Sequence, residues 1–140
     1  MNLPSKDIGD LLVSMGIGTR ATGADWRVAQ GTSSAKPDRC ITIYDTPGVT
    51  PDPKWQQDEP TVMIHIRGAP TPDDYPVAGA KAKQVRDALL GRPPAALGGT
   101  YYMGIWSIGD VGYIGPDENG RPVFSCNFRL LRSGSGGYRE

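Results

Sequence analysis

The feature that most constrains the fold is a β-hairpin close to the end of the sequence. Asn119-Gly120 is a dipeptide that supplies the positive φ angles of a two-residue type I′ turn, and the runs on both sides have the composition of strands. In residues 123–131 apolar and polar side chains alternate, which predicts a strand with one buried face. The apolar face comprises Phe124, Cys126, Phe128 and Leu130, and the polar face comprises Ser125, Asn127 and Arg129.

Only residues 133–140 follow this predicted strand. Their Gly and Ser content is typical of a flexible tail, and they have no apolar face that could pack on a sheet. The strand therefore needs a partner from elsewhere. Either another strand of the same chain pairs with it, or another subunit meets the sheet.

Other stretches also have strand patterns. Strands are predicted at residues 40–45, 61–67, 101–108 and 112–114, with a further candidate at 26–28. In residues 61–67, Val62, Ile64 and Ile66 alternate with Met63, His65 and Arg67. This alternation predicts a strand that buries one face.

Two segments have the apolar period of a helix. The first spans residues 5–15, with Ser5 as the predicted N-cap and Gly16 as the stop signal. The second spans residues 74–90 and ends at Gly91, before two prolines. Its predicted start signals are Asp74 or Tyr75 at the cap and Pro76 near the first helical position.

The order of these elements predicts an α+β fold. We expect a mostly antiparallel or mixed sheet with two helices packed beside it and a C-terminal β-hairpin. A chain of 140 residues has the usual size of one domain. We expect residues 1–132 to form a single domain and residues 133–140 to be the flexible tail.

A proline-rich connection, residues 46–60, separates two of the predicted strands. Prolines at 47, 51, 53 and 60 withhold backbone donors, so we expect this segment to stay outside any sheet or helix. Connections of this length without regular structure tend to be functional or disordered. Trp55 in its middle either anchors the loop on its own domain or contacts a partner. We expect the loop to serve assembly and not folding.

Charge and hydropathy exclude several classes of protein. Lys and Arg total 15 and Asp and Glu total 15, so no overall field attracts a nucleic-acid backbone or an anionic membrane. The apolar runs are too short to cross a bilayer, and the N-terminus lacks the basic-then-apolar pattern of a signal peptide. We therefore expect a soluble, unexported protein with no membrane partner.

Few residues offer the chemistry of a reaction. His65 is the one histidine and lies in mid-strand, without a predicted partner to orient it as a base. The acidic pairs Asp73-Asp74 and Asp117-Glu118 occupy turn and cap positions, which explains them without catalysis. Cys40 and Cys126 lack metal-ligand spacing and are predicted to be reduced core thiols, with a disulfide between neighbouring strands as the alternative. We expect no catalytic, cofactor or metal site, and hence a protein that is not an enzyme.

The candidate contacts with a subunit or partner are Trp55, Arg67, Arg129 and Arg132. Aromatic residues and Arg dominate interface hot spots, and a guanidinium pairs with a carboxylate through two parallel bonds. The alternative is that the arginines lie on a solvated strand face and that the tryptophan packs on its own domain.

Several stretches together carry a family resemblance. They are Ile41–Gly48, Pro60–Gly68, the helical positions Tyr75, Ala78, Ala82, Val85 and Leu89 to Gly91, and the hairpin residues 117–121 and 124–129. Over residues 3–132 the sequence resembles the minor capsid or tail-terminator proteins of long-tailed bacteriophages. The resemblance implies an α+β fold and a hexameric ring that caps the tail tube and receives the head.

The resemblance also implies partners and a location. The partners would be other copies of the chain, the tail tube protein and the head-tail connector protein. The protein would lie in the neck of the virion after assembly in the host cytoplasm, and DNA would pass through the ring without sequence-specific binding. No cofactor is implied.

Two other functions stay open at this point. One is a head-completion or connector ring protein, which would share the size and symmetry but bind the portal side. The other is a small ligand-binding or hydrolytic domain whose site lies between the 46–60 loop and the sheet. Convergent polar groups with perturbed pKa values in a pocket would indicate the second.

Overall fold

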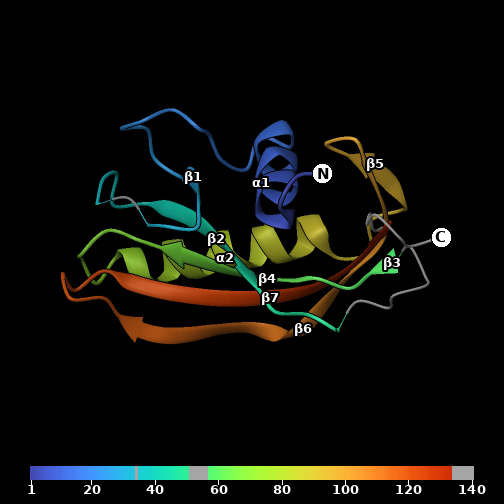
Figure 1. Ribbon diagram of the computed structural model, residues 1–140. Coiled ribbons are helices and arrows are strands. Elements are labelled where there is room, and N and C mark those ends of the chain that lie inside the picture. The colour runs from blue at the N-terminus through green and yellow to red at the C-terminus, as the bar shows by residue number, and fades with distance from the viewer. Residues whose placement is uncertain (34, 51–56, 134–140) are drawn as a thin grey trace.

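Two helices cover one face of a seven-stranded sheet, as the computed structural model shows for residues 1–33, 35–50 and 57–133 (Figure 1). The helices are α1 (Pro4–Ser14) and α2 (Asp74–Leu89). The strands are β1 (Arg27–Gln30), β2 (Cys40–Thr46), β3 (Gln57–Asp58), β4 (Thr61–Arg67), β5 (Ala95–Leu97), β6 (Thr100–Pro116) and β7 (Pro122–Ser133). Their order is β1-β2-β4-β7-β6-β5, β3 also pairs with β7, and only β1 and β2 run parallel. The predicted fold class is confirmed.

β7 lies in the centre of the sheet, between β4 and β6 (Figure 1). Thr61 of β4 lies opposite Arg129 at one end of this pairing, and Arg67 lies opposite Val123 at the other. The predicted alternation is confirmed, because Phe128 is fully buried whereas its neighbour Arg129 is exposed. The last strand therefore finds its partners within its own chain.

A single hydrophobic cluster joins both helices to the covered face of the sheet. The largest fully buried side chains in it are Phe128, Ile8, Leu12, Ile41, Ile43, Ile64, Ile66, Leu89 and Leu130. Burial of each such side chain contributes about 1.5–3 kcal/mol. α2 contributes small residues, chiefly Ala78 and Ala82, so its axis can lie close to the strands. The two cysteines are buried and free, as predicted.

The connection between β6 and β7 is not the predicted two-residue turn. Residues 117–121 form it, and the Gly120 N–H donates to the Asp117 carbonyl at 3.0 Å. Gly120 has a φ of 76°, but Asn119 does not have a positive φ. The Asp117 carboxylate accepts the N–H groups of Asn119 at 3.0 Å and of Arg121 at 2.9 Å. These bonds favour a longer turn with one left-handed glycine, so the type I′ prediction was wrong.

The start of α1 also differs from the prediction. The helix begins at Pro4 with Leu3 at the N-cap, and Ser5 lies inside the first turn. Asp45 of β2 takes the capping role, because its Oδ1 accepts the Ser5 N–H at 2.9 Å and its Oδ2 accepts the Ser5 hydroxyl at 2.6 Å. A carboxylate is favourable at this positive end of a helix. The Ser5 N-cap prediction was wrong because a tertiary partner supplies the acceptor.

The predicted extent of α2 is confirmed to within about one residue, but neither Asp74 nor Tyr75 is the N-cap. Its first helical residue is Asp74, its N-cap is Asp73 and its last residue is Leu89. Gly91 follows with a φ of 65°, as expected for a glycine just past a helix end. Within the described part of the chain, neither helix is long and apolar enough to span a membrane.

The proline-rich connection contains a short strand that was not predicted. In β3, Gln57 pairs with Ser133 and Asp58 pairs with Arg132. We expected all of residues 46–60 to stay outside the sheet, and this was wrong for Gln57 and Asp58. Neither residue is a proline, so both keep the backbone N–H groups that strand pairing uses. Residues 51–56, which include Trp55, lie outside the described residues.

Candidate functional site

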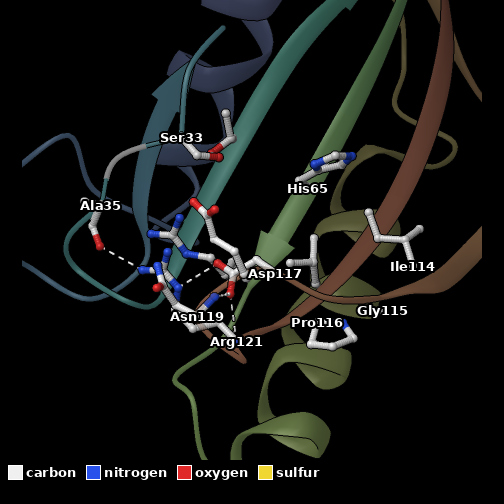
Figure 2. A pocket seen from close by; sticks show the side chains of 13 residues that line it. Ser33, Ala35, His65, Ile114, Gly115, Pro116, Asp117, Asn119 and Arg121 are labelled. Carbon is white, nitrogen blue, oxygen red and sulfur yellow. Dashed lines mark hydrogen bonds and ion pairs between the residues drawn. The ribbon is translucent and has the colours of Figure 1, made fainter.

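A hollow of about 480 Å³ lies beside the β6–β7 connection (Figure 2). Arg121 and Asp117 lie at its hairpin end, Ser33 and Ala35 come from the segment before β2, and His65 lies further along β4. The hollow is on the sheet face that the helices leave open. It lies at the end of β4 that is away from the 46–60 loop. The ligand-binding alternative had placed a site beside that loop, so this hollow is not the expected one.

Two arginines at the hollow make bonds within the subunit. Arg67 is 7% exposed, and its Nε and Nη2 donate to the carbonyls of Asp38 and Pro37, both at 2.9 Å. Burial, and then the charge of Arg121, lower the pKa of the Arg67 guanidinium. The side chain predicted as an interface candidate thus serves to fasten residues 37–38 to β4.

Arg121 fastens the same segment to the hairpin. Its Nε donates to Asp117 Oδ2 at 2.7 Å and its Nη1 donates to the Ala35 carbonyl at 2.8 Å, as the dashed lines in Figure 2 mark. Burial alone would raise the pKa of Asp117, but the bonds from Arg121 and from the Asn119 amide leave it below the usual value. The carboxylate therefore stays charged as a structural acceptor.

His65 shows no arrangement for proton transfer. Its ring meets the Tyr44 ring edge-on, with centroids 5.1 Å apart, and the described residues give its nitrogens no hydrogen-bond partner. Burial lowers its pKa, so the imidazole is neutral near pH 7. A catalytic base needs a partner that orients it. Among the described residues, those that line this hollow hold separate segments of the chain together and show no catalytic arrangement.

A second feature of the open face is a tryptophan that packs beside an arginine of the neighbouring strand. Trp106 of β6 is opposite Arg129 of β7, whose guanidinium carbon is 5.2 Å from the indole centroid. A Cβ on Gly104 would come within 2.4 Å of the indole, so the glycine provides the space in which the ring lies. Trp106 is 43% exposed and Arg129 is also exposed. Trp and Arg are residue types that are common at interface hot spots, and here the two side chains already pack on each other within one subunit.

The sequence did not single out Trp106. Its pairing with Arg129 depends on the strand register, which is set by an irregularity of β6 between Ile108 and Gly112. Gly109 within this bulge has a φ of 71°, and Asp110 pairs with Arg86 of α2 at 2.9 Å. Such a bulge shifts every side chain beyond it, so sequence alternation alone could not have matched the two side chains.

β6 also forms the one extended open edge of the sheet among the described residues. β5 covers only Thr100 to Tyr102, and no described strand pairs with the outer side of β6 from Met103 to Pro116. An unpaired edge offers backbone donors and acceptors to another chain. Ile108 and Ile114 on this strand are 48% and 56% exposed.

Arg132 lies at the opposite end of β7, next to the N-terminus. Its Nη1 donates to the Asn2 carbonyl at 2.9 Å and to the Tyr102 hydroxyl at 3.3 Å. Of the four candidate interface residues, Arg129 thus lies on an open surface, whereas Arg67 and Arg132 make bonds inside the subunit. Trp55 lies outside the described residues.

An open strand edge and an exposed Trp–Arg pair are surfaces of the kind that contact other proteins. Residues 12–132 match the family described as bacteriophage tail terminator protein, and the chain belongs to that family. The family is structural and not enzymatic, so the protein is a component of the phage tail in the virion and associates with the tail tube. No curated protein matches the sequence significantly.

Proposed function

We propose that the protein forms a closed homohexameric ring that ends growth of the tail tube and joins the tail to the head connector in the neck of the virion. DNA passes through the opening of this ring without sequence-specific contacts. The observation that carries the proposal is membership of the tail terminator family over residues 12–132. A ring subunit needs surfaces for its neighbours and no active site.

The surface that we assign to the neighbouring subunit runs along β6. It combines the open edge from Met103 to Pro116 with the Trp106–Arg129 pair on the adjacent face. An incoming chain could bond to the edge and bury the indole, and a large aromatic ring contributes more to binding than the polar contacts around it.

The mass of the purified protein at tens of micromolar, alone and with purified tail tubes, tests the ring. Native mass spectrometry is expected to give six copies, and Trp106→Ala and Arg129→Glu are expected to shift the mass toward the monomer. Val77→Ala is the matched control, because Val77 is an apolar residue of α2 with a similar exposure of 38%. A monomer both in solution and in assembled particles would contradict the proposal.

A further inference from the structure

The open edge of β6 has the composition of a strand that pairs readily with another copy of itself. Of its 17 residues only Asp110 is charged, whereas exposed edge strands are commonly protected by charged side chains, lysine above all. β-branched and aromatic side chains, which favour strand pairing, are exposed on both sides of Asp110. They are Trp106, Ile108, Tyr113 and Ile114. A flat strand of this composition is a site of aggregation.

β6 is not flat, because it contains a bulge after Ile108. On β6 the pairing with β7 steps from Ile108 to Gly112. On β7 the matching step is only from Asn127 to Ser125, so β6 carries extra residues at this point. Gly109, with a φ of 71°, permits the change of direction. A bulge bends its strand and increases the local twist, so the outer edge is not continuous here.

Bonds within the subunit hold this bulge, which comprises Gly109–Val111. Asp110 Oδ1 accepts the Val111 N–H at 2.7 Å and Nη1 of Arg86, from α2, at 2.9 Å. The bond from Arg86 lowers the pKa of Asp110, so the carboxylate is charged at neutral pH. The Val111 side chain packs against the core. The bulge is therefore tied to the helix layer and to the core.

The position of the bulge decides what happens when two open edges meet. In an antiparallel pair that used the whole edge, Met103–Pro116, the two-fold axis would pass between Gly109 and Asp110, the middle of that range. The two bulges would then meet, and two carboxylates would lie about 5 Å apart on adjacent strands. Parallel in-register stacking would bring the same carboxylates within about 4.8 Å. Facing bulges cannot form a regular ladder, and the like charges add to the cost.

A shorter pairing that used only Met103–Ile108 of both copies would meet a different obstacle. Beyond Met103 the edge is occupied by β5, which pairs with Thr100 to Tyr102. In an antiparallel pair the incoming β6 would reach that position directly after its own Ile108, and it would collide with β5. The stretch therefore suits a strand that ends within it, and β6 is not such a strand.

We propose that the Gly109–Val111 bulge, with Asp110 bonded to Arg86, prevents two copies of the chain from pairing through their β6 edges. This role belongs to the free subunit, so it goes beyond the proposed ring and holds whether or not the ring forms. Pairing of this kind would occupy both open edges and remove them from assembly. The bulge keeps Met103–Ile108 available to a different surface of a neighbouring subunit.

Deletion of Gly109 and Asp110 tests the bulge directly. Without the extra residues, Val111 would lie opposite Cys126 and keep its side chain on the core face, while the edge would become continuous and uncharged. In analytical ultracentrifugation at tens of micromolar, the dimer fraction is expected to rise about tenfold over the wild type. Hydrogen exchange of the Met103–Ile108 amides is expected to slow in this dimer.

Three further variants separate the bulge from its charge and from general effects on folding. Asp110→Ala keeps the chain length and is expected to give a smaller rise in dimer. Ile108→Lys, added to the deletion protein, restores a charge to the edge and should return the mass to that of the wild type. Asp87→Ala is the matched control, because Asp87 also bonds to Arg86 at 2.9 Å and its side chain is 65% exposed, against 70% for Asp110. It should leave the dimer fraction unchanged.

The outcomes distinguish this inference from the ring. A dimer fraction that stays at the wild-type level in Asp110→Ala and in folded deletion protein would overturn the inference, and where the deletion protein fails to unfold cooperatively Asp110→Ala decides alone. A wild-type dimer whose Met103–Ile108 amides are already protected from exchange would also overturn it. A monomeric wild type whose deletion variant dimerises would support the role of the bulge and contradict the ring. Six copies in the wild type without a dimer in either variant would do the reverse.

Discussion

The clearest test of the internal architecture is Tyr102→Phe. Asp7 of α1 is 1% exposed, and its Oδ2 accepts the Tyr102 hydroxyl at 2.6 Å. Burial, and then the bond to Asp7, raise the pKa of Tyr102 above its usual range, so the phenol stays protonated and remains a donor. The substitution removes one oxygen atom and leaves the ring in place.

The expected loss follows from the acceptor that remains. A hydrogen bond to a charged group contributes about 1.5–3 kcal/mol, and a buried acceptor without a partner costs a similar amount. Among the described residues, the Asp7 carboxylate keeps the Asn2 amide, whose Nδ2 lies 3.1 Å from Oδ1, and Arg132 loses its 3.3 Å bond to the same hydroxyl. We expect the free energy of unfolding to fall by about 2 kcal/mol, which corresponds to a decrease in Tm of about 5–10 °C for a domain of this size.

Tyr101→Phe is the control for this experiment. Tyr101 precedes Tyr102 in β6 and is 48% exposed, so loss of its hydroxyl should change stability by less than about 0.5 kcal/mol. Urea unfolding of both variants at pH 7 gives the comparison. If the two variants lose the same amount, Tyr102 does not stabilise the buried carboxylate and the reasoning is wrong.

Two further predictions concern the hairpin and acid stability. Gly120→Val should lower the free energy of unfolding by about 1–3 kcal/mol, because Gly120 has a φ of 76°, which a β-branched residue resists. Gly112→Val is the control, since Gly112 lies on the same hairpin with open space around it and the substitution should cost far less. Equal Tm values for the two variants would contradict this prediction. The Arg39 hydrogen bond lowers the pKa of Asp74, so this carboxylate adds stability above about pH 4 that is lost as the pH falls through its folded pKa. In urea unfolding at pH 7 and pH 3, Arg39→Gln should lose less stability on acidification than the wild type; an equal loss would exclude the pair as a cause.

The elements that sequence predicts well are those in which a single face decides the pattern. In β7, Phe128 and Leu130 are buried and Arg129 between them is exposed, because one face of the strand meets the helices. α2 is predicted for the same reason. Its alanine stripe indicates one buried helical face, and the glycine that follows indicates where the helix ends. These are local signals, and the tertiary structure agrees with them.

The errors occur where a distant side chain replaces a local signal. Asp45 of β2 takes over the capping role predicted for Ser5. The Asp117 carboxylate captures two backbone N–H groups and lengthens the predicted turn. Residues 37–38 cover Arg67 on a strand face that alternation had marked as polar. None of these partners is adjacent in sequence to the residue that it affects.

The interface residues show the same division. Arg129 could be placed on the polar face of its strand from alternation alone, but its partner Trp106 depends on the register of β6 after a bulge. The rings of Tyr75 at the start of α2 and Tyr113 on β6 lie 5.0 Å apart, and the sequence alone gives no measure of that distance. Sequence therefore identified residue types that suit an interface, and the structure shows which of them share a surface.

The two edges of the sheet differ in a way that bears on assembly. At β1 the outer side is closed by residues 18–20, because the Val28 N–H donates to the Thr19 carbonyl at 2.7 Å and the Thr19 N–H donates to the Trp26 carbonyl at 3.0 Å. The outer side of β6 is open from Met103 onward in the described part of the chain. If two copies paired through their open β6 edges, the backbone groups of both edges would be hydrogen-bonded and assembly would stop at a dimer.

A ring requires a second, different surface on each copy. The closed edge at β1 does not offer one, so the complement of β6 must come from another part of the molecule.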